Sequence, residues 1–285
     1  MKPTLRTLTL LLLAGVLQVN AKTLLPVALA SKGQSTVSSG SSPSAPVVLK
    51  QPLSAGSTIT TDAEGRLALA LGPGQMIVLH KASQVEIVSP YDDATGNGAV
   101  VQLIAGQVSC SIDPKFGHSG PVFKLLAGQQ TIQAKGTAWQ TGIAANGQVT
   151  NVVLSSTVNV AVAGGNFSAN VSAGSVLISS YTNGGLTGAV LVNLVTGQTT
   201  SYSSSGEPAI ALASTAQLAT ASVALQAAVN GASSEGGGGS GSAALNSLIA
   251  SVNVTLNAAG ISAITSPSNT GAPVGRDSTV SPEQP

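Results

Sequence analysis

The chain has few charged and few aromatic residues for its length of 285 residues. Charged residues make up 7% of the sequence, against about a quarter in an average soluble protein. The polar surface must therefore be built from Ser, Thr, Asn, Gln and Gly. The formal net charge is +1 and no basic patch is present, so nucleic-acid binding has no electrostatic basis and we expect no nucleic-acid partner.

Cysteine is almost absent, because Cys110 is the single one. An intramolecular disulfide is therefore excluded in any compartment. Cys110 lies in VVQLIAGQVSCSI, where alternation from Val108 places Cys110 and Ile112 on one face of a predicted strand. We predict a buried core residue, and a reactive or intermolecular thiol is the alternative.

Residues for catalysis or metal binding are also sparse. The two histidines, His80 and His118, have no Cys or carboxylate at ligand spacing, and we interpret both as surface or loop residues. Asp92 and Asp93 lack the alternate acidic spacing of calcium loops, which favours a polar hairpin loop over a calcium site. No nucleophile elbow or carboxylate pair can be assigned. We therefore predict that the protein is not an enzyme and that it has no catalytic, cofactor-binding or metal-binding residues and no cofactor. A hydrolase, with a site assembled from residues distant in the sequence, is a third functional class beside the two given below.

The first 21 residues have the pattern of a secretory signal peptide. Lys2 and Arg6 precede an apolar run from Leu8 to Leu17, and small residues lead to a cleavage site after Ala21. A second small-residue site at 28–30 leaves the cleavage point open, and the run is short for a transmembrane anchor. No cysteine follows either site, so a lipoprotein anchor has no attachment point. We predict a periplasmic or secreted bacterial protein without a transmembrane anchor after cleavage.

The residues that follow divide into a linker and a β region. Residues 22–46 are rich in Ser, Gly and Pro, and we expect a flexible linker. From 47 to 182 the chain repeats a β run, a Gly-containing turn and another β run. This spacing predicts a mainly β fold, either a twisted β-sandwich or a β-helix-like stack of short strands. The four turns of the form Ala-Gly-Ser/Gln are at 55–57, 105–107, 127–129 and 173–175.

The stretch FKLLAGQQTIQAKGTAWQT, residues 123–141, is the most structured part of this region. Phe123 and Leu125, and then Ile132 and Ala134, alternate as in half-buried strands on either side of a glycine turn. Trp139 is the only tryptophan. In a chain with so few large side chains, Trp139 and Phe123 are predicted to anchor the core.

The order of these segments resembles the FecR domain of extracytoplasmic regulators and other exported proteins. The matching segments run over roughly residues 50–180, and Gly136-Thr137 followed by Trp139 is the most specific part. The resemblance implies a FecR-like β domain in an extracytoplasmic setting. The segments are LSAGSTITTDAEGRLALAL, GQMIVLHKASQVEI, VQLIAGQVSCSI, the 123–141 stretch, and residues 148–160 and 171–178.

Two departures from the family pattern limit what the resemblance implies. The family usually has a glycine where this chain has Ser155-Ser156, which leaves the turn there undefined. FecR regulators also carry a cytoplasmic helical domain and a transmembrane helix, whereas a predicted cleavable signal precedes the domain here. The resemblance therefore does not transfer the sigma-factor regulatory activity to this chain.

The C-terminal third changes its periodicity. Residues 183–206 predict an additional β-hairpin with a turn at Thr196-Gly197. Residues 207–260 predict two Ala-rich helices joined by a Gly linker, the first starting at Glu207-Pro208 and the second capped by Ser242 and closed by Gly260. Ile210, Leu218, Leu225 and Val229 are expected on one face of the first helix, and the second has a stripe from Leu245 to Leu256. Residues 261–285 are expected to be disordered.

The apolar faces of these helices allow two interpretations. They can pack on each other or cap an open edge of the β region, or they can dock a partner protein. For the whole chain we predict a non-catalytic exported protein that acts in protein–protein interaction or scaffolding in the cell envelope, with a role in signalling as one form. The alternative is a module for adhesion or for binding surface polysaccharide, which the few aromatic residues, Trp139, Tyr91, Tyr181 and Tyr202, do not favour. The predicted partner is thus an envelope protein or a surface polysaccharide.

Overall fold

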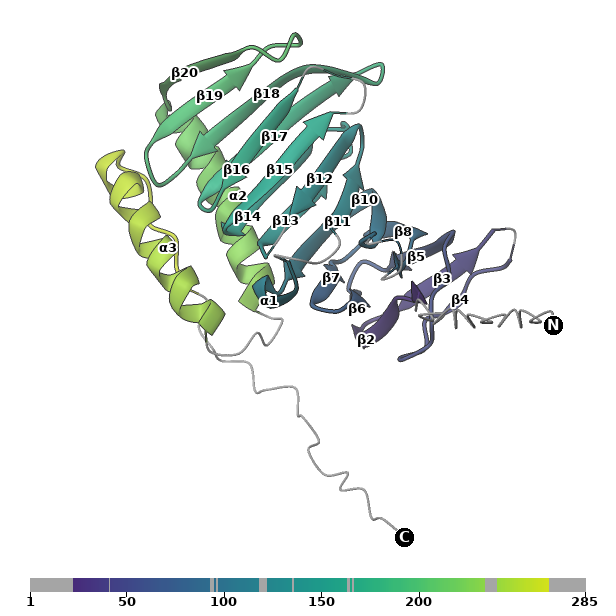
Figure 1. The fold of residues 1–285 in the computed structure, drawn as a ribbon. Helices are drawn as coiled ribbons and strands as arrows, with labels where there is room; N and C mark the ends of the chain where they lie inside the picture. Colours follow the sequence, from purple (N-terminus) through teal and green to yellow (C-terminus); the bar gives the residue numbers. More distant parts are fainter. Residues whose placement is uncertain are drawn as a thin grey trace, which may run out of the picture.

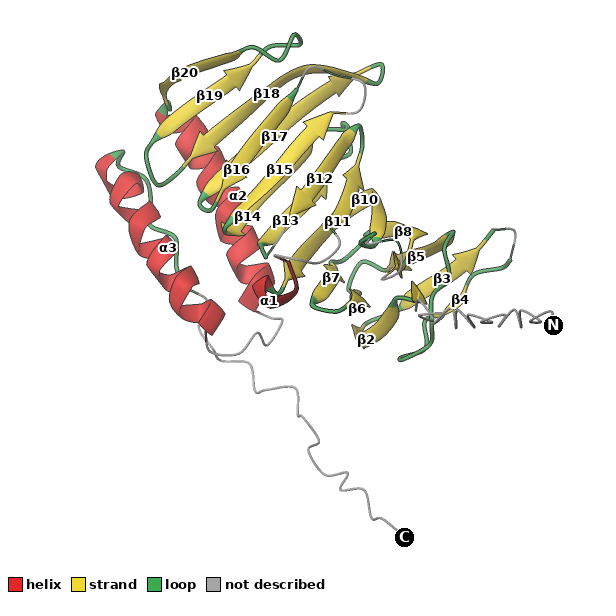
Figure 2. Ribbon diagram, viewed as in Figure 1, coloured by secondary structure: helices red, strands yellow, loops and turns green. Residues whose placement is uncertain are grey.

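The protein is mainly β, as the sequence predicts, with two long helices near its C-terminal end (Figures 1 and 2). The computed structural model describes residues 23–40, 42–92, 95, 97–117, 122–134, 136–162, 165, 167–233 and 240–266. The predicted signal peptide, the Gly-rich segment 234–239 and residues 267–285 lie outside these ranges. The strands form two large sheets, which we name sheet I and sheet II, and one small pair.

Sheet I is antiparallel apart from the parallel pair β10–β11. Its strand order is β4 (Ala45–Pro46), β3 (Ser35–Ser39), β5 (Ser57–Thr61), β8 (Gln84–Ser89), β10 (Val100–Ile112), β11 (Phe123–Ala127), β12 (Gln130–Ala134), β15 (Thr157–Val162) and β16 (Ser168–Ser172).

Sheet II is antiparallel throughout. Its last strands continue beyond the point where sheet I ends. Its order is β2 (Val27–Lys32), β6 (Arg66–Gly72), β7 (Gln75–Leu79), β10, β13 (Ala138–Ile143), β14 (Val149–Ser155), β17 (Ser175–Thr182), β18 (Gly185–Asn193), β19 (Gln198–Tyr202) and β20 (Pro208–Leu212). The small pair is β1 (Thr23–Leu24) with β9 (Tyr91–Asp92), and a short helix α1 (Pro114–Gly117) follows β10.

Strand β10 belongs to both sheets. Residues 100–105 pair with β8 and β11 in sheet I, and residues 106–112 pair with β7 and β13 in sheet II. The predicted turn at Ala105-Gly106-Gln107 is therefore wrong, because the chain bends there and continues as a strand. Gly106 has φ +81°, and a Cβ on it would lie 2.5 Å from Ser83 Oγ and 2.6 Å from the Ala82 carbonyl oxygen. Only glycine fits this bend without displacing its neighbours.

The main core lies between the two sheets and confirms the predicted anchors. Trp139 and Phe123 are both buried, and their ring centroids are 5.8 Å apart with the planes tilted by 50°. Cys110 is buried, forms no disulfide and lies opposite Trp139 in the β10–β13 ladder. The inward residues of both sheets thus form one sandwich core, the first of the two predicted β architectures.

The expected linker at residues 22–46 is wrong for most of its length. β2 pairs with β6 in sheet II, and β3 pairs with β5 in sheet I. Ala28 and Ser35 are buried although their side chains are small. Main-chain ladder hydrogen bonds do not depend on side-chain size, so a Ser- and Ala-rich segment can extend a sheet that already exists.

The C-terminal extension begins with the predicted hairpin, which is present as β18 and β19, with Gly197 at φ +70° in the turn. The first helix does not start at Glu207, because residues 208–212 form strand β20 alongside β19. Helix α2 (Thr215–Ser233) starts after Ser214 instead. Ser214 Oγ accepts from the Gln217 amide and Gln217 Oε1 accepts from the Ser214 amide, which is a capping box. Ile210 is consequently on an exposed strand and not on the helix face with Leu218.

Helices α2 and α3 (Ser240–Ala258) pack on the outer face of sheet II, on the side opposite the core (Figure 2). Leu218, Leu225 and Val229 of α2 are buried with Ile249 and Val252 of α3 against β14, β17 and β18. Of the two interpretations, the helices therefore pack on the β region, and they cover a sheet face and not a sheet edge.

The end of α3 and the residues after it are ordered. Gly260 has φ +71°, the Ile261 amide donates to the Leu256 carbonyl and the Gly260 amide to the Asn257 carbonyl, which is a Schellman motif. Ile264 is buried and exchanges two hydrogen bonds with the Asn253 side chain. The expected disorder from residue 261 is therefore wrong for 261–266, because this apolar segment fills the space beside the helices.

Candidate functional site

His80 lies just after the end of β7, and it is half-buried beneath the end of α2, not on the open surface. Its Nε2 lies 2.7 Å from Ser109 Oγ and 3.2 Å from Gln140 Nε2. A Cβ on Gly231 of α2 would lie 3.1 Å from its ring. Burial, and after it the positive charge of Arg66, lowers the pKa of His80 from 6.5 to about 4.

This polar cluster has a structural role in holding α2 on sheet II. Arg66 Nη2 donates a 2.7 Å hydrogen bond to the Gly231 carbonyl in the last turn of α2. A cation at this position satisfies a terminal carbonyl and interacts favourably with the helix dipole. His80, Ser109 and Gln140 fill the space below. The cluster joins the strands at one end of sheet II to a helix that starts at the other end.

The other residues considered for metal binding do not form a site. Asp92 accepts a 2.9 Å hydrogen bond from Thr95 Oγ1, so its carboxylate closes the loop after β9. His118 and Asp93 lie outside the described residues. Within the described ranges no group of three His, Cys, Asp or Glu residues could hold a metal ion.

The aromatic residues considered for sugar binding are engaged in packing. Trp139 and Tyr91 are buried in the core, and Tyr181 and Tyr202 are half-buried against it. The Tyr202 ring contacts the Phe167 ring edge-to-face, with centroids 4.9 Å apart. These four rings therefore do not offer the exposed flat surface on which sugars stack.

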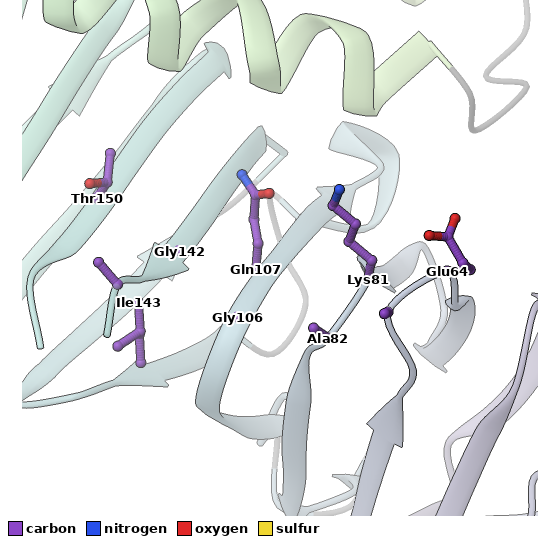
Figure 3. A pocket seen from close by; sticks show the side chains of 10 residues that line it. Glu64, Lys81, Ala82, Gly106, Gln107, Gly142, Ile143 and Thr150 are labelled. Carbon is purple, nitrogen blue, oxygen red and sulfur yellow. The ribbon is translucent and has the colours of Figure 1, made fainter. Parts of the chain in front are cut away.

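A shallow depression of about 690 Å³ lies where β10 passes between the sheets. In Figure 3, Glu64 and Lys81 lie at one end of it and Ile143 and Thr150 at the other, with Gln107 between them. The lining carries one carboxylate and one amine, which have opposite signs. That set cannot act as the carboxylate pair of a glycosidase.

Of the four edges of sheets I and II in the described residues, three are protected against pairing with another chain. Residues 50–53 cover the first part of β2, since the Lys50 amide donates to the Ala28 carbonyl and the Leu53 amide to the Pro26 carbonyl, and the strand ends in the exposed, charged Lys32. β4 has two residues and ends with Pro46. β16 presents three exposed polar side chains, Ser168, Asn170 and Ser172. Short strands, proline, polar side chains and covering loops are the devices that keep sheet edges from associating.

The fourth edge, β20, is unprotected and apolar. Its sequence is PAIAL, all five residues are exposed, and Ile210 and Leu212 have 72% and 82% of their surface accessible. The strand carries no charged residue, and β19 beside it carries none either. Figure 1 shows β20 at the end of the molecule farthest from β2. Exposed apolar strand edges of this kind mark interaction sites.

The large side chains of β20 lie on the side of sheet II that faces sheet I. Cross-strand partners share a face, so Ile210 aligns with Thr200 of β19 and then with Leu191 of β18, which packs against the main core. Sheet I ends at β16, and sheet II continues beyond it. Ile210 and Leu212 are therefore left uncovered, and we take β20 with these side chains as the candidate functional site.

Sequence reasoning missed this site because Ala209 and Ala211 gave the segment a helical composition. The available signal was the alternation of Ala with Ile and Leu after Pro208, since proline is tolerated as the first residue of an edge strand.

Comparison with known proteins finds a family match for the central part of the chain. Residues 57–159 match the family described as FecR protein. No match is found among curated proteins. Two crystal structures, at 2.50 Å and 1.65 Å, of a protein described as a putative anti-sigma factor from Parabacteroides distasonis ATCC 8503 are 14% and 13% identical to this chain. Each superposition has a TM-score of 0.40 and covers 48% of this chain and 59% of the other. This chain therefore spans less than two thirds of the length of those proteins.

A separate finding concerns membrane association. None of the helices in the described residues is both long enough and apolar enough to cross a bilayer.

Proposed function

Given that residues 57–159 form a FecR domain, we propose that this protein is an exported, non-catalytic FecR-domain protein that acts by binding another protein in the cell envelope. The binding would serve signalling or scaffolding. The observation that carries this proposal is the β20 edge, an exposed apolar strand, whereas the three other edges of sheets I and II in the described residues are protected. An added strand gains main-chain hydrogen bonds from such an edge and specificity from the alternate side chains.

The FecR domain supports the proposal by its rigidity. Its sheets share β10 and enclose one core, so β20 is presented at the end of a fixed sheet and does not have to be ordered on binding. Interfaces that are preorganised lose less conformational entropy on association.

Site-specific photo-crosslinking in cells tests the binding role. A photoreactive residue at Leu212 is expected to give a discrete crosslinked species, and Ile210→Lys in the same chain is expected to remove it. The matched control is the same probe at Val223 of α2, which is also exposed, at 71%, but belongs to a helix and not to the edge strand. Equal crosslinking from both positions, or none from Leu212, would contradict the proposal.

Export is the second part of the proposal and rests on residues 1–21. N-terminal sequencing of the protein from envelope or culture fractions is expected to begin at Lys22. A protein that retains Met1 in the cytoplasmic fraction would contradict the proposed localisation.

A further inference from the structure

The hydrogen-bonding pattern of β20 specifies which of its main-chain groups are available to a partner. In its ladder with β19, paired residues have numbers that sum to 410, as in Thr199 with Ala211. The Ala213 amide donates to the Gly197 carbonyl, and the Ser203 amide to the Glu207 carbonyl. Antiparallel pairs alternate between hydrogen-bonded and non-bonded, so Ala209 and Ala211 bond to β19. The main-chain groups of Pro208, Ile210 and Leu212 therefore point to the free edge.

These outward groups complement a second copy of themselves. In an antiparallel pair with Ile210 opposite Ile210 of the second copy, each Ile210 amide meets the other Ile210 carbonyl. Each Leu212 amide then meets the Pro208 carbonyl of the other copy. Proline has no N–H, so every outward amide of β20 finds an acceptor in this one register. The two copies are related by a twofold axis that passes between the paired Ile210 residues, perpendicular to the sheet. Twofold symmetry is the commonest symmetry of homo-oligomers.

Side chains and charges favour the same arrangement. Pro208, Ile210 and Leu212 share one face, so the twofold pair places six apolar side chains next to each other across the two strands. β19 and β20 carry no charge that would oppose a like charge in the second copy. Dimer formation would partly cover the exposed side chains of Ile210 and Leu212, and burial of apolar surface is favourable.

We propose that the partner of β20 is a second copy of this chain, and that the two copies join their sheets II into one continuous sheet through antiparallel β20 strands. This inference rests on the proposed role of β20 as a protein interface, and it fixes both the partner and the register. Because each strand has five residues and four intermolecular hydrogen bonds form, the dimer is reversible and its population rises with concentration.

Single cysteines test the register directly. The Cα atoms of a hydrogen-bonded antiparallel pair are about 5.5 Å apart, which suits a disulfide, whereas residues displaced by four positions are about 13 Å apart. In the mature chain, which begins at Lys22, Ile210→Cys is expected to form a disulfide-linked dimer under mild oxidation. Leu212→Cys, on the same face, is expected to form none, because it lies opposite Pro208. Native Cys110 is buried and is the background control in the parent chain.

The oligomeric state supplies the second readout. The mature chain is expected to shift from monomer to dimer with increasing concentration in light scattering coupled to size exclusion. Ile210→Pro removes only an outward amide, so it should remain folded by circular dichroism and stay monomeric. A monomeric parent at all concentrations, or equal disulfide formation at 210 and 212, would overturn the inference. If the parent is monomeric while Leu212 still crosslinks a different protein in cells, the proposed function stands and only the identity of the partner is wrong.

Discussion

The region that matches the FecR family and the C-terminal extension are built from different side chains, although they share sheet II. The first region buries Trp139 and Phe123 between the sheets and depends on the left-handed bend at Gly106. The extension packs Leu, Ile, Val and Ala from two helices on the outer face, with no aromatic residue in that cluster. The first region is a fixed scaffold that depends on a few large residues. The second is a layer of many small contacts that ends in an exposed edge.

The largest effect should come from the scaffold. Trp139→Ala is expected to lower the free energy of unfolding by about 3–5 kcal/mol, because it removes a buried large aromatic ring and leaves a cavity. Denaturant unfolding followed by circular dichroism measures it. The matched control is Ile210→Ala, which removes an exposed side chain and should change stability little. A Trp139→Ala protein as stable as the parent would show that the ring is not the core anchor.

In the extension, Leu225→Ala is expected to cost about 2–4 kcal/mol, because Leu225 is fully buried between α2 and sheet II. Helical and sheet signals should be lost in a single transition if the helices are part of the fold. Two separate transitions, with the sheet signal unchanged, would mean that the helices are an independent docking arm and not part of one cooperative fold.

Gly106→Ala is expected to cost about 2–3 kcal/mol, because a left-handed backbone costs about 1–2 kcal/mol and crowding against Ser83 adds to it. Gly147→Ala is the control for the backbone contribution alone, since Gly147 has φ +77° but no atom within 4 Å of the added Cβ. Equal losses in the two variants would show that the bend of β10 tolerates a side chain.

His80 predicts a pH dependence at the junction of the two regions. Its pKa is 6.5 when unfolded and about 4 when folded, with Arg66 of β6 as the charged group that faces it. Between these pH values the unfolded state binds a proton that the folded state does not, so stability is lost as the pH falls from 6.5 toward 4. His80→Gln should show a smaller fall in melting temperature over that range. An identical fall would place the acid sensitivity elsewhere.

Ser156→Gly should give the smallest change, a gain of about 0.5–1 kcal/mol. Ser156 has φ +57°, and glycine adopts this conformation more cheaply, although glycine costs more entropy on folding. Ser156→Ala retains the strained backbone and is not expected to gain stability. Thermal melting of the three proteins distinguishes them, and a less stable Ser156→Gly would mean that the serine side chain has a role of its own.

Ser156 also shows which features of the fold could be predicted from the sequence. The missing glycine at Ser155-Ser156 left the turn undefined, and the structure has the left-handed residue at that step. Strand alternation likewise predicted the burial of Cys110, and the scarcity of large side chains predicted the burial of Trp139. These predictions depend on local periodicity and on composition, which a sequence displays directly.

Other features depend on tertiary context that no local pattern carries. Ala105-Gly106 has the composition of a turn, and only the pairing of β10 with strands of both sheets keeps it extended. β2, β3 and β20 are rich in small residues and become strands because an existing sheet edge pairs with them. His80 was interpreted as a surface or loop residue, and no local pattern showed that α2, more than 130 residues later in the sequence, covers it.

The sharing of β10 has a consequence for how such a protein can change in length. β10 is in the interior of both sheets, so their free margins all lie away from it. Strands can therefore be gained or lost at the margins without altering the shared strand or the core around Trp139. The strands of sheets I and II that lie wholly outside residues 57–159 are at these margins, β2 to β4 on one side and β16 to β20 on the other. The outermost strand of a sheet is the one with unpaired main-chain groups, so β20 is placed where it can meet another molecule.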